Sequence, residues 1–208
     1  GVVMGGIDSN LICDDMKALG VKYLTVYAFS TENWKRSKEE VDGLMKLFRN
    51  YLKKCIKISE KNKMCVRVIG DIHAFDSDIQ ESIQRLEEYS KDFTELHFQI
   101  ALNYGGRDEI TRGIRRLAQD VKDGKIAPEA ISEELVEGYW DTAGLPDPDL
   151  LIRTSGEQRL SNFLPWQLAY TEFYFTPVAW PDFNREELVK AIEKYNERDR
   201  RYGGVKEE

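Results

Sequence analysis

The chain has 208 residues, 41% of them hydrophobic and 32% charged, which suits one sizeable core and is marginal for two domains, so we predict a single domain over residues 1–208. Its formal net charge of −7 argues against a general nucleic-acid binder, and an acidic chain that binds a small anion must concentrate arginines locally. No apolar run approaches the roughly 18 residues of a membrane span, and three scattered cysteines predict reduced thiols in a cytoplasmic protein rather than a zinc site or a disulfide framework.

Short runs rich in β-branched and aromatic residues are predicted to be buried strands, because their hydrophobicity is nearly continuous. In chain order they are Val2–Met4, Tyr23–Phe29, Cys65–Ile69, His97–Leu102, Leu150–Arg153 and Glu172–Phe175. Helical patterns are found at Asp8–Leu19, Lys38–Asn62, Asp76–Ser90, Arg107–Val121, Ser132–Tyr139 and Arg185–Arg201. This alternation predicts an α/β fold with a central, mainly parallel sheet flanked by helices. Ligands of such sheets bind beyond the carboxyl ends of the strands, so the segments after those strands are the informative ones.

The first such segment is YAFSTENWKR, residues Tyr27–Arg36, which leaves a strand and enters a polar turn before a long helix. Ser30 and Asn33 can offer hydrogen bonds, and Arg36 a cation. Taken alone, a strand end followed by a helix-capping turn is the better interpretation. Trp34 is more often a core or lid residue than a ligand contact.

The second segment is NYGGR, residues Asn103–Arg107, directly after a strand. Paired glycines let the backbone approach an anion, and Arg107 opens a helix whose N-terminus favours negative charge. A plain turn between strand and helix explains this segment equally well.

The third segment, LIRTSGEQRLSNF, carries the strongest signal. Arg153 ends a strand, and Arg159 and Ser161 follow within eight residues. Two guanidinium groups and a hydroxyl suit a diphosphate, because the planar guanidinium matches the geometry of phosphate oxygens. Surface arginines paired with Glu157 and Asp149 are the alternative, which we favour less.

The fourth segment, YTEFYFTPVAWPDF, places Glu172 among aromatic and apolar residues. A carboxylate in such company needs a partner, because burying a bare charge is costly. From this segment alone, the Glu172 carboxylate could equally well bind Mg²⁺ shared with substrate phosphates or form a salt bridge to an arginine.

Together these segments resemble the cis-prenyltransferase family, and among its members bacterial undecaprenyl diphosphate synthase. The motifs YAFSTENWKR, RVIGD, NYGGR, IRTSGEQRLSNF and EFYFTPVAWPDF occur in the family's order at similar separations. The resemblance implies an α/β domain with a hydrophobic tunnel, a homodimer, and a Mg²⁺-dependent enzyme. It also implies that isopentenyl diphosphate units are added in cis to an allylic diphosphate such as farnesyl diphosphate. The long product would be the lipid carrier for cell-wall synthesis, with peripheral membrane contact when it is released.

The same resemblance assigns roles to residues. It implies that Arg153, Arg159 and Ser161 bind the isopentenyl diphosphate group and that Glu172 is a Mg²⁺-associated, catalytic carboxylate. It implies that Ser30, Asn33, Trp34 and Arg36 form the loop that couples primer binding to catalysis, with Asn33 in a catalytic role. Arg201 and Gly203 resemble an R-x-G element that reaches a diphosphate across the dimer interface.

One departure from the family concerns the N-terminus. Family members begin with a strand followed by M-D-G-N-G-R-W, whose aspartate is the principal magnesium-binding and catalytic carboxylate. Here Met4 is followed at once by Gly5, Gly6, Ile7 and Asp8, so a loop is missing between about residues 4 and 7. Asp8 lies at a predicted helix start and is interpreted as a cap, not as the missing aspartate.

Two other functions compete with an active synthase. A non-catalytic, cis-prenyltransferase-like scaffold or partner subunit fits the missing loop, but a scaffold has no need of Arg153, Arg159 and Glu172 together. A generic nucleotide or phosphate-ester enzyme is weaker still, because no Walker or dinucleotide-binding glycine pattern is present.

Overall fold

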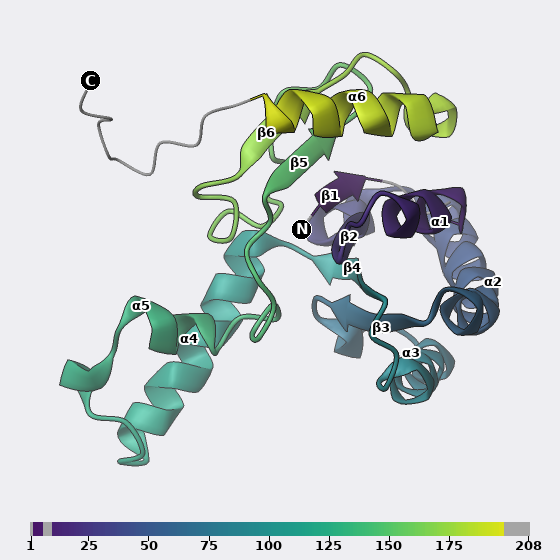
Figure 1. Cartoon of the computed structure of the whole chain (residues 1–208). Helices are drawn as coiled ribbons and strands as arrows, with labels where there is room; N and C mark the ends of the chain where they lie inside the picture. The colour runs from purple at the N-terminus through teal and green to yellow at the C-terminus, as the bar shows by residue number, and fades with distance from the viewer. Residues whose placement is uncertain (1, 6–9, 198–208) are drawn as a thin grey trace, which may run out of the picture.

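The computed structural model describes residues 2–5 and 10–197, and its centre is a sheet of parallel strands (Figure 1). The strands are β1 (Val2–Gly5), β2 (Tyr23–Ser30), β3 (Met64–Ile69), β4 (Leu96–Tyr104), β5 (Leu150–Arg153) and β6 (Glu172–Phe175). Their order in the sheet is β3-β4-β2-β1-β5-β6, and every neighbouring pair is parallel. All six predicted strands are therefore confirmed, and the bounds of the last two were predicted to the residue.

Among the described residues, six α-helices and four short 3₁₀ segments lie between and after the strands. The helices are α1 (Asn10–Ala18), α2 (Lys38–Asn62), α3 (Ser77–Ser90), α4 (Gly106–Lys122), α5 (Glu133–Glu137) and α6 (Arg185–Asn196). The 3₁₀ segments are η1 (Thr31–Lys35), η2 (Ile72–Ala74), η3 (Pro128–Ala130) and η4 (Trp180–Asp182). Helix α2 begins after Ser37, whose side chain accepts a hydrogen bond from the Glu40 amide, and it has the predicted bounds.

The two faces of the sheet contact different parts of the chain. Alternate strand residues, such as Val26 and Ile100, join a large core with apolar residues of α1, α2, α3 and α6. Ala101 and Leu151 point to the other face, where they pack against Phe163 and Leu164 of the segment after β5. The long segment between β5 and β6 is thereby held against the sheet by its own apolar side chains.

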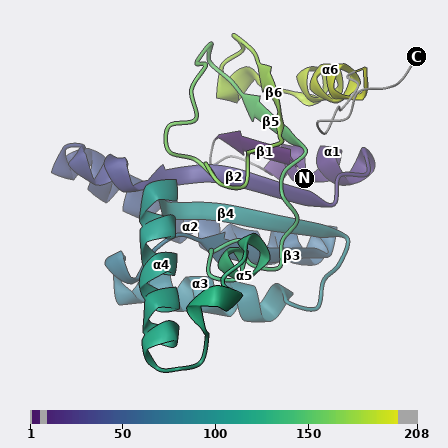
Figure 2. The same ribbon diagram turned by 90° about the vertical axis from the view of Figure 1, so that its left-hand side faces the viewer.

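Helix α4 lies on the opposite side of β2 and β4 from α2 and α3 (Figure 2). Its first turn is anchored by Glu109, which is fully buried. The Glu109 carboxylate accepts hydrogen bonds from the Tyr104 hydroxyl at 2.5 Å, the Asp141 amide at 2.9 Å and the Gln167 side chain at 3.2 Å. Burial raises the pKa of this carboxyl, and the bonds from Tyr104 and Gln167 oppose that rise.

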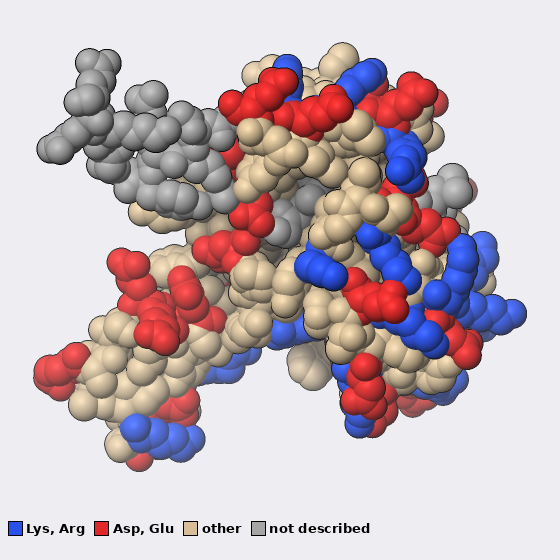
Figure 3. Space-filling model, viewed as in Figure 1, with Lys and Arg blue, Asp and Glu red and all other residues tan. Residues whose placement is uncertain are grey.

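Acidic side chains gather over α5 in the view of Figure 3, and Glu133 and Glu134 lie in the first turn of this helix.

Among the described helices, none combines the length and hydrophobicity needed to cross a bilayer. The apolar stripes of α2 and α3 are largely buried in the core, with residues such as Phe48, Leu52 and Ile83 almost inaccessible. Which of these residues line a tunnel stays a prediction.

Candidate active site

A cavity of about 820 Å³ opens at the carboxyl edge of the sheet. One wall is the end of β2 with the following loop, from Tyr27 to Arg36, and the other is the end of β5 with the segment from Thr154 to Phe163. Strand β1 lies between these two strands, and its last residue, Gly5, is in register with Tyr27. The cavity lies at the edge to which the sequence pointed, since parallel strands place their carboxyl ends together.

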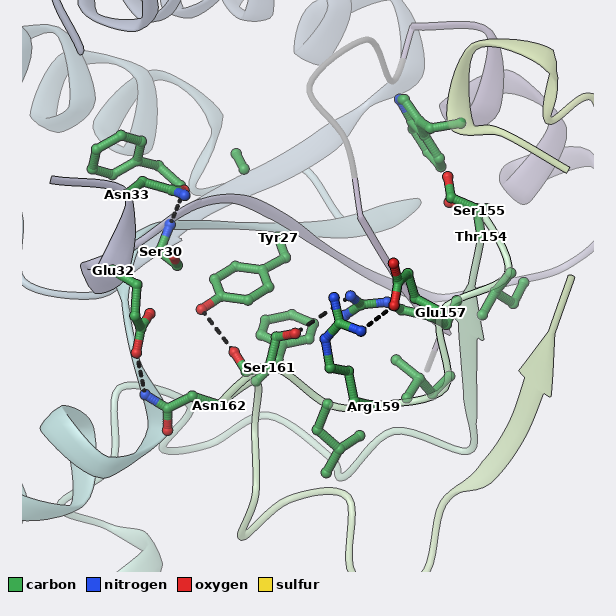
Figure 4. Close-up of a pocket in the computed structure, with 18 of the residues that line it drawn as sticks. Tyr27, Ser30, Glu32, Asn33, Thr154, Ser155, Glu157, Arg159, Ser161 and Asn162 are labelled. Atoms are coloured by element: carbon green, nitrogen blue, oxygen red, sulfur yellow. Dashed lines mark hydrogen bonds and ion pairs between the residues drawn. The ribbon is translucent and has the colours of Figure 1, made fainter. Parts of the chain in front are cut away.

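Arg153, Arg159 and Ser161 all line this cavity, as the third motif predicted. Figure 4 labels Arg159 and Ser161 there. The Arg153 guanidinium donates a hydrogen bond to the Ser161 hydroxyl at 3.3 Å. Arg159 is paired with Glu157, so the surface ion pair considered as the alternative exists for this arginine. Arg153 forms no ion pair with a described residue, which leaves its charge available to an anion.

The loop after β2 supplies the opposite wall. Asn33 accepts a hydrogen bond from the Ser30 amide at 2.9 Å, which closes the turn that the capping interpretation predicted. Ser30, Asn33 and Arg36 also line the cavity, so the segment that forms this turn also forms one wall of the cavity. Within the described residues, the cavity carries three arginines and two glutamates, and one of these glutamates neutralises Arg159.

Trp34 does not line this cavity. Its ring packs edge-on against Phe29, with centroids 5.0 Å apart, and contacts Phe75 in the aromatic cluster between the sheet and α2. Its indole N–H donates to the Asn103 side chain at 2.7 Å, and the amide of Asn103 donates to the Asp71 carbonyl at 2.7 Å. Asn103, the first residue of NYGGR, therefore supports the tryptophan rather than an anion.

We expect Asn103→Ala to destabilise the protein by about 1–3 kcal/mol, because it removes the acceptor of the Trp34 indole N–H and the donor to the Asp71 carbonyl, and Asn103 itself is buried. Asn103 has φ 47°, a left-handed conformation that alanine adopts poorly. Asn103→Gly loses the same bonds without the backbone strain, so it should be about 1 kcal/mol more stable than the alanine variant. Urea unfolding measures both, with the exposed Asn50→Ala as a control within about 0.5 kcal/mol of wild type. Equal stabilities for Asn103→Ala and Asn50→Ala would contradict this role.

Glu172 is placed away from the other predicted site residues. It begins β6 in register with Leu150, whereas Arg153 is in register with Phe175 at the cavity edge. Three residues of strand separate the two positions, or about 10 Å. Glu172 is therefore not among the residues that line the cavity.

The described residues do not by themselves form a metal site. They contain no group of three or more histidine, cysteine, aspartate or glutamate side chains that could hold an ion. The cavity's own carboxylates, Glu32 and Glu157, are engaged by Asn162 and Arg159. Arg201 and Gly203 lie outside the described residues, as do Gly6 and Asp8.

Comparison with known proteins identifies the family. A family model described as "Putative undecaprenyl diphosphate synthase" matches residues 4–203. The chain is 52% identical over 195 residues to an isoprenyl transferase of Clostridium perfringens, covering 94% of this chain and 77% of that protein. An isoprenyl transferase of Streptococcus agalactiae is 53% identical over 191 residues, covering 90% and 76%. The chain belongs to the undecaprenyl diphosphate synthase family.

Solved structures agree with this assignment. A lavandulyl diphosphate synthase from Lavandula x intermedia, in complex with dimethylallyl diphosphate, superposes with a TM-score of 0.93 at 34% identity, over 98% of this chain and 97% of the other. A probable undecaprenyl diphosphate synthase from Campylobacter jejuni gives 0.85 at 32% identity, over 97% of each chain. The single α/β domain and its parallel sheet are those of an undecaprenyl diphosphate synthase family member.

Three residues of the site were missed by the sequence interpretation. Tyr27 stacks on Phe163, with ring centroids 4.2 Å apart, and its hydroxyl donates to the Tyr104 carbonyl at 3.0 Å. Burial raises its pKa, so the phenol stays protonated. Glu32 and Asn162 meet across the cavity through a hydrogen bond of 3.1 Å (Figure 4). Both belong to motifs that the sequence singled out, but nothing in the spacing pairs residues so far apart.

Proposed function

We propose that the chain elongates an allylic diphosphate in cis with isopentenyl diphosphate units, giving a long-chain polyprenyl diphosphate such as undecaprenyl diphosphate. The observation that carries the proposal is the meeting of Arg153 and Ser161 with Ser30 and Arg36 around one cavity. Guanidinium and hydroxyl donors on two walls suit two diphosphate groups held side by side. The relatives named as isoprenyl transferases support the same reaction, and a non-catalytic scaffold is not favoured.

In this reaction the C–O bond between the allylic carbon and its diphosphate breaks, and the electron pair leaves with the diphosphate. The double bond of isopentenyl diphosphate then forms the new C–C bond to that carbon, and the resulting cation loses a proton to an oxygen of the departed diphosphate, which restores a double bond. Arg36 faces the cavity without an ion pair to a described residue, so it can stabilise charge that develops on a diphosphate. Arg153 and Ser161 hold the second diphosphate, which orients the attacking double bond.

We also propose that the reaction depends on Mg²⁺, because the sequence resembles a family of Mg²⁺-dependent enzymes. Mg²⁺ is commonly bound by one or two carboxylates together with substrate phosphates, so a site completed by the substrate needs few protein ligands. Because the described residues do not form a magnesium site alone, no step above depends on the metal. Glu172 would contribute only together with groups beyond those that line the cavity.

The remaining parts of the proposal concern assembly and location. The resemblance supports a homodimer in which Arg201 and Gly203 reach the partner's diphosphate site. A cytoplasmic location, with peripheral membrane contact when the lipid product leaves, is proposed on the same basis. The missing loop would follow β1, whose end at Gly5 lies next to Tyr27 at the cavity edge.

The test is incorporation of labelled isopentenyl diphosphate with farnesyl diphosphate as primer, in Mg²⁺ and in EDTA, with product length read by chromatography. It uses two proteins, the chain as given and a chain in which the missing family loop, beginning D-G-N-G-R-W, is restored after Met4. We expect undecaprenyl-length product from the restored chain in Mg²⁺ and at least a hundredfold less in EDTA. No product from either protein would overturn the proposal and favour a scaffold.

A further inference from the structure

The Asn162 side chain joins the two walls of the cavity by a hydrogen bond, beside the stack of Tyr27 on Phe163. Asn162 follows Ser161 on one wall, and Glu32 precedes Asn33 on the other, 130 residues away. The Asn162 side-chain N–H₂ donates to one Glu32 carboxylate oxygen at 3.1 Å, and the Thr31 hydroxyl donates to the other at 3.2 Å. The segments that carry the proposed diphosphate donors thus contact each other directly through this bond.

The orientation of the Asn162 amide is fixed by the start of α4. Its side-chain oxygen accepts a hydrogen bond from the Arg107 amide at 3.0 Å, and its backbone carbonyl accepts one from the Gly106 amide at 2.7 Å. A backbone N–H can only donate, so the oxygen of Asn162 must face α4. The N–H₂ group must then face Glu32, where a carboxylate is the matching acceptor.

The backbone around this contact is built for close approach. Ser161, Asn162 and Leu164 have φ values of 50°, 63° and 47°, in the left-handed region that asparagine tolerates better than most residues. A Cβ on Gly105 would lie 2.6 Å from the Thr31 hydroxyl oxygen and 2.9 Å from the Asn162 side-chain nitrogen. Both walls therefore approach the same glycine, and a side chain at position 105 would clash with groups of both walls.

We infer that Asn162 is a positioning residue that couples the two diphosphate-binding walls, so that occupation of one wall orders the other. This inference rests on the proposed function and names the regulation of the same site. A diphosphate on Arg153 and Ser161 fixes the segment that contains Asn162, and through Glu32 this fixes the turn that presents Ser30 and Asn33. The two substrates should then bind cooperatively, with the same coupling factor in either order.

The polarity of the bond allows a matched test. Asn162→Asp keeps the acceptor for the Arg107 amide but sets a carboxylate against the Glu32 carboxylate. Glu32→Gln in the same chain turns the other partner into a donor, so the double variant regains the bond with its direction reversed. Asn50→Asp, the same substitution at an exposed position of α2, controls for the added charge.

The measurement is calorimetric binding of isopentenyl diphosphate with and without farnesyl thiodiphosphate, an analogue that ionises slowly. It uses the protein that forms product in the incorporation assay, either the chain as given or the chain with the restored loop. We expect a coupling factor of at least five in wild type and in Asn50→Asp, about one in Asn162→Asp, and recovery to at least half of the wild-type factor in the double variant. Urea unfolding checks that all variants are folded.

The outcomes separate the inference from the proposed function. No turnover by either chain removes the proposed function and the inference with it. If the protein forms product but its wild-type coupling factor is one, the inference alone is overturned. The same holds if the coupling factor of Asn162→Asp equals that of wild type. Failure of the double variant to recover the factor while remaining folded also overturns it, because the reversed bond should restore the contact.

Discussion

Arg153→Lys is expected to raise the KM for isopentenyl diphosphate by about 10- to 100-fold and to leave the charge of the cavity unchanged. The guanidinium already donates to the Ser161 hydroxyl at 3.3 Å, so a diphosphate bound between them would meet two preoriented donors. Lysine keeps the positive charge but offers a single ammonium in place of the planar fork. Losing one charge-assisted hydrogen bond costs about 1.5–3 kcal/mol, which is about one to two orders of magnitude in affinity.

Two matched substitutions show whether this effect belongs to the site. Arg159→Lys should have a smaller effect, because Arg159 is exposed and already paired with Glu157. Arg185→Lys, on α6 and bonded to Asp15, should leave the kinetics unchanged. Steady-state rates at saturating primer measure all three. An Arg153→Lys enzyme with the KM of the Arg185→Lys enzyme would remove Arg153 from the substrate site.

The fold was largely predictable because its strands are short runs rich in β-branched, aliphatic and aromatic residues. Leu150–Arg153 and Glu172–Phe175 have the predicted bounds, but only the first is a buried strand, since β6 is an edge strand whose residues are half-buried or exposed. Helix α2 was predicted to the residue from its apolar stripe of 3.6-residue period, and in the structure Ser37 caps its start and Lys63 ends it in a left-handed conformation. The sheet order could not be predicted, since the pairing of β1 with both β2 and β5 depends on contacts between segments far apart in sequence.

The residues of the candidate cavity were predictable where they lie at or just after strand ends. Arg153 and Ser30 are the last residues of β5 and β2, and both line the cavity. The same rule argues against grouping Glu172 with them, because Glu172 starts its strand and so lies toward the other edge of the sheet. Glu32 and Asn162 have no local signal, since their contact exists only after the two walls have been brought together.

Gly106→Ala is expected to destabilise the protein by about 2 kcal/mol or more, although alanine is the better helix former. A Cβ at this position would lie 2.0 Å from Cδ and 2.4 Å from Cγ of Pro165, and 3.1 Å from the Asn162 carbonyl oxygen. The proline ring cannot rotate away, so the segment that contains Ser161 and Asn162 must shift. The same variant should therefore also weaken binding of isopentenyl diphosphate.

Gly43→Ala separates this steric effect from helix propensity. Gly43 is exposed in the interior of α2, and nothing lies within 4 Å of the place its Cβ would occupy. Alanine there should stabilise the protein by about 0.5–1 kcal/mol without changing the kinetics. Opposite signs for the two substitutions in urea unfolding are the expected result. If Gly106→Ala also stabilised the protein and bound isopentenyl diphosphate normally, the close approach of α4 to the Pro165 segment would not govern the site. In that case the paired glycines of NYGGR would serve only as a turn. The close contacts of Gly105 with Thr31 and of Gly106 with Pro165 argue instead that these glycines let α4 begin in contact with both walls of the cavity.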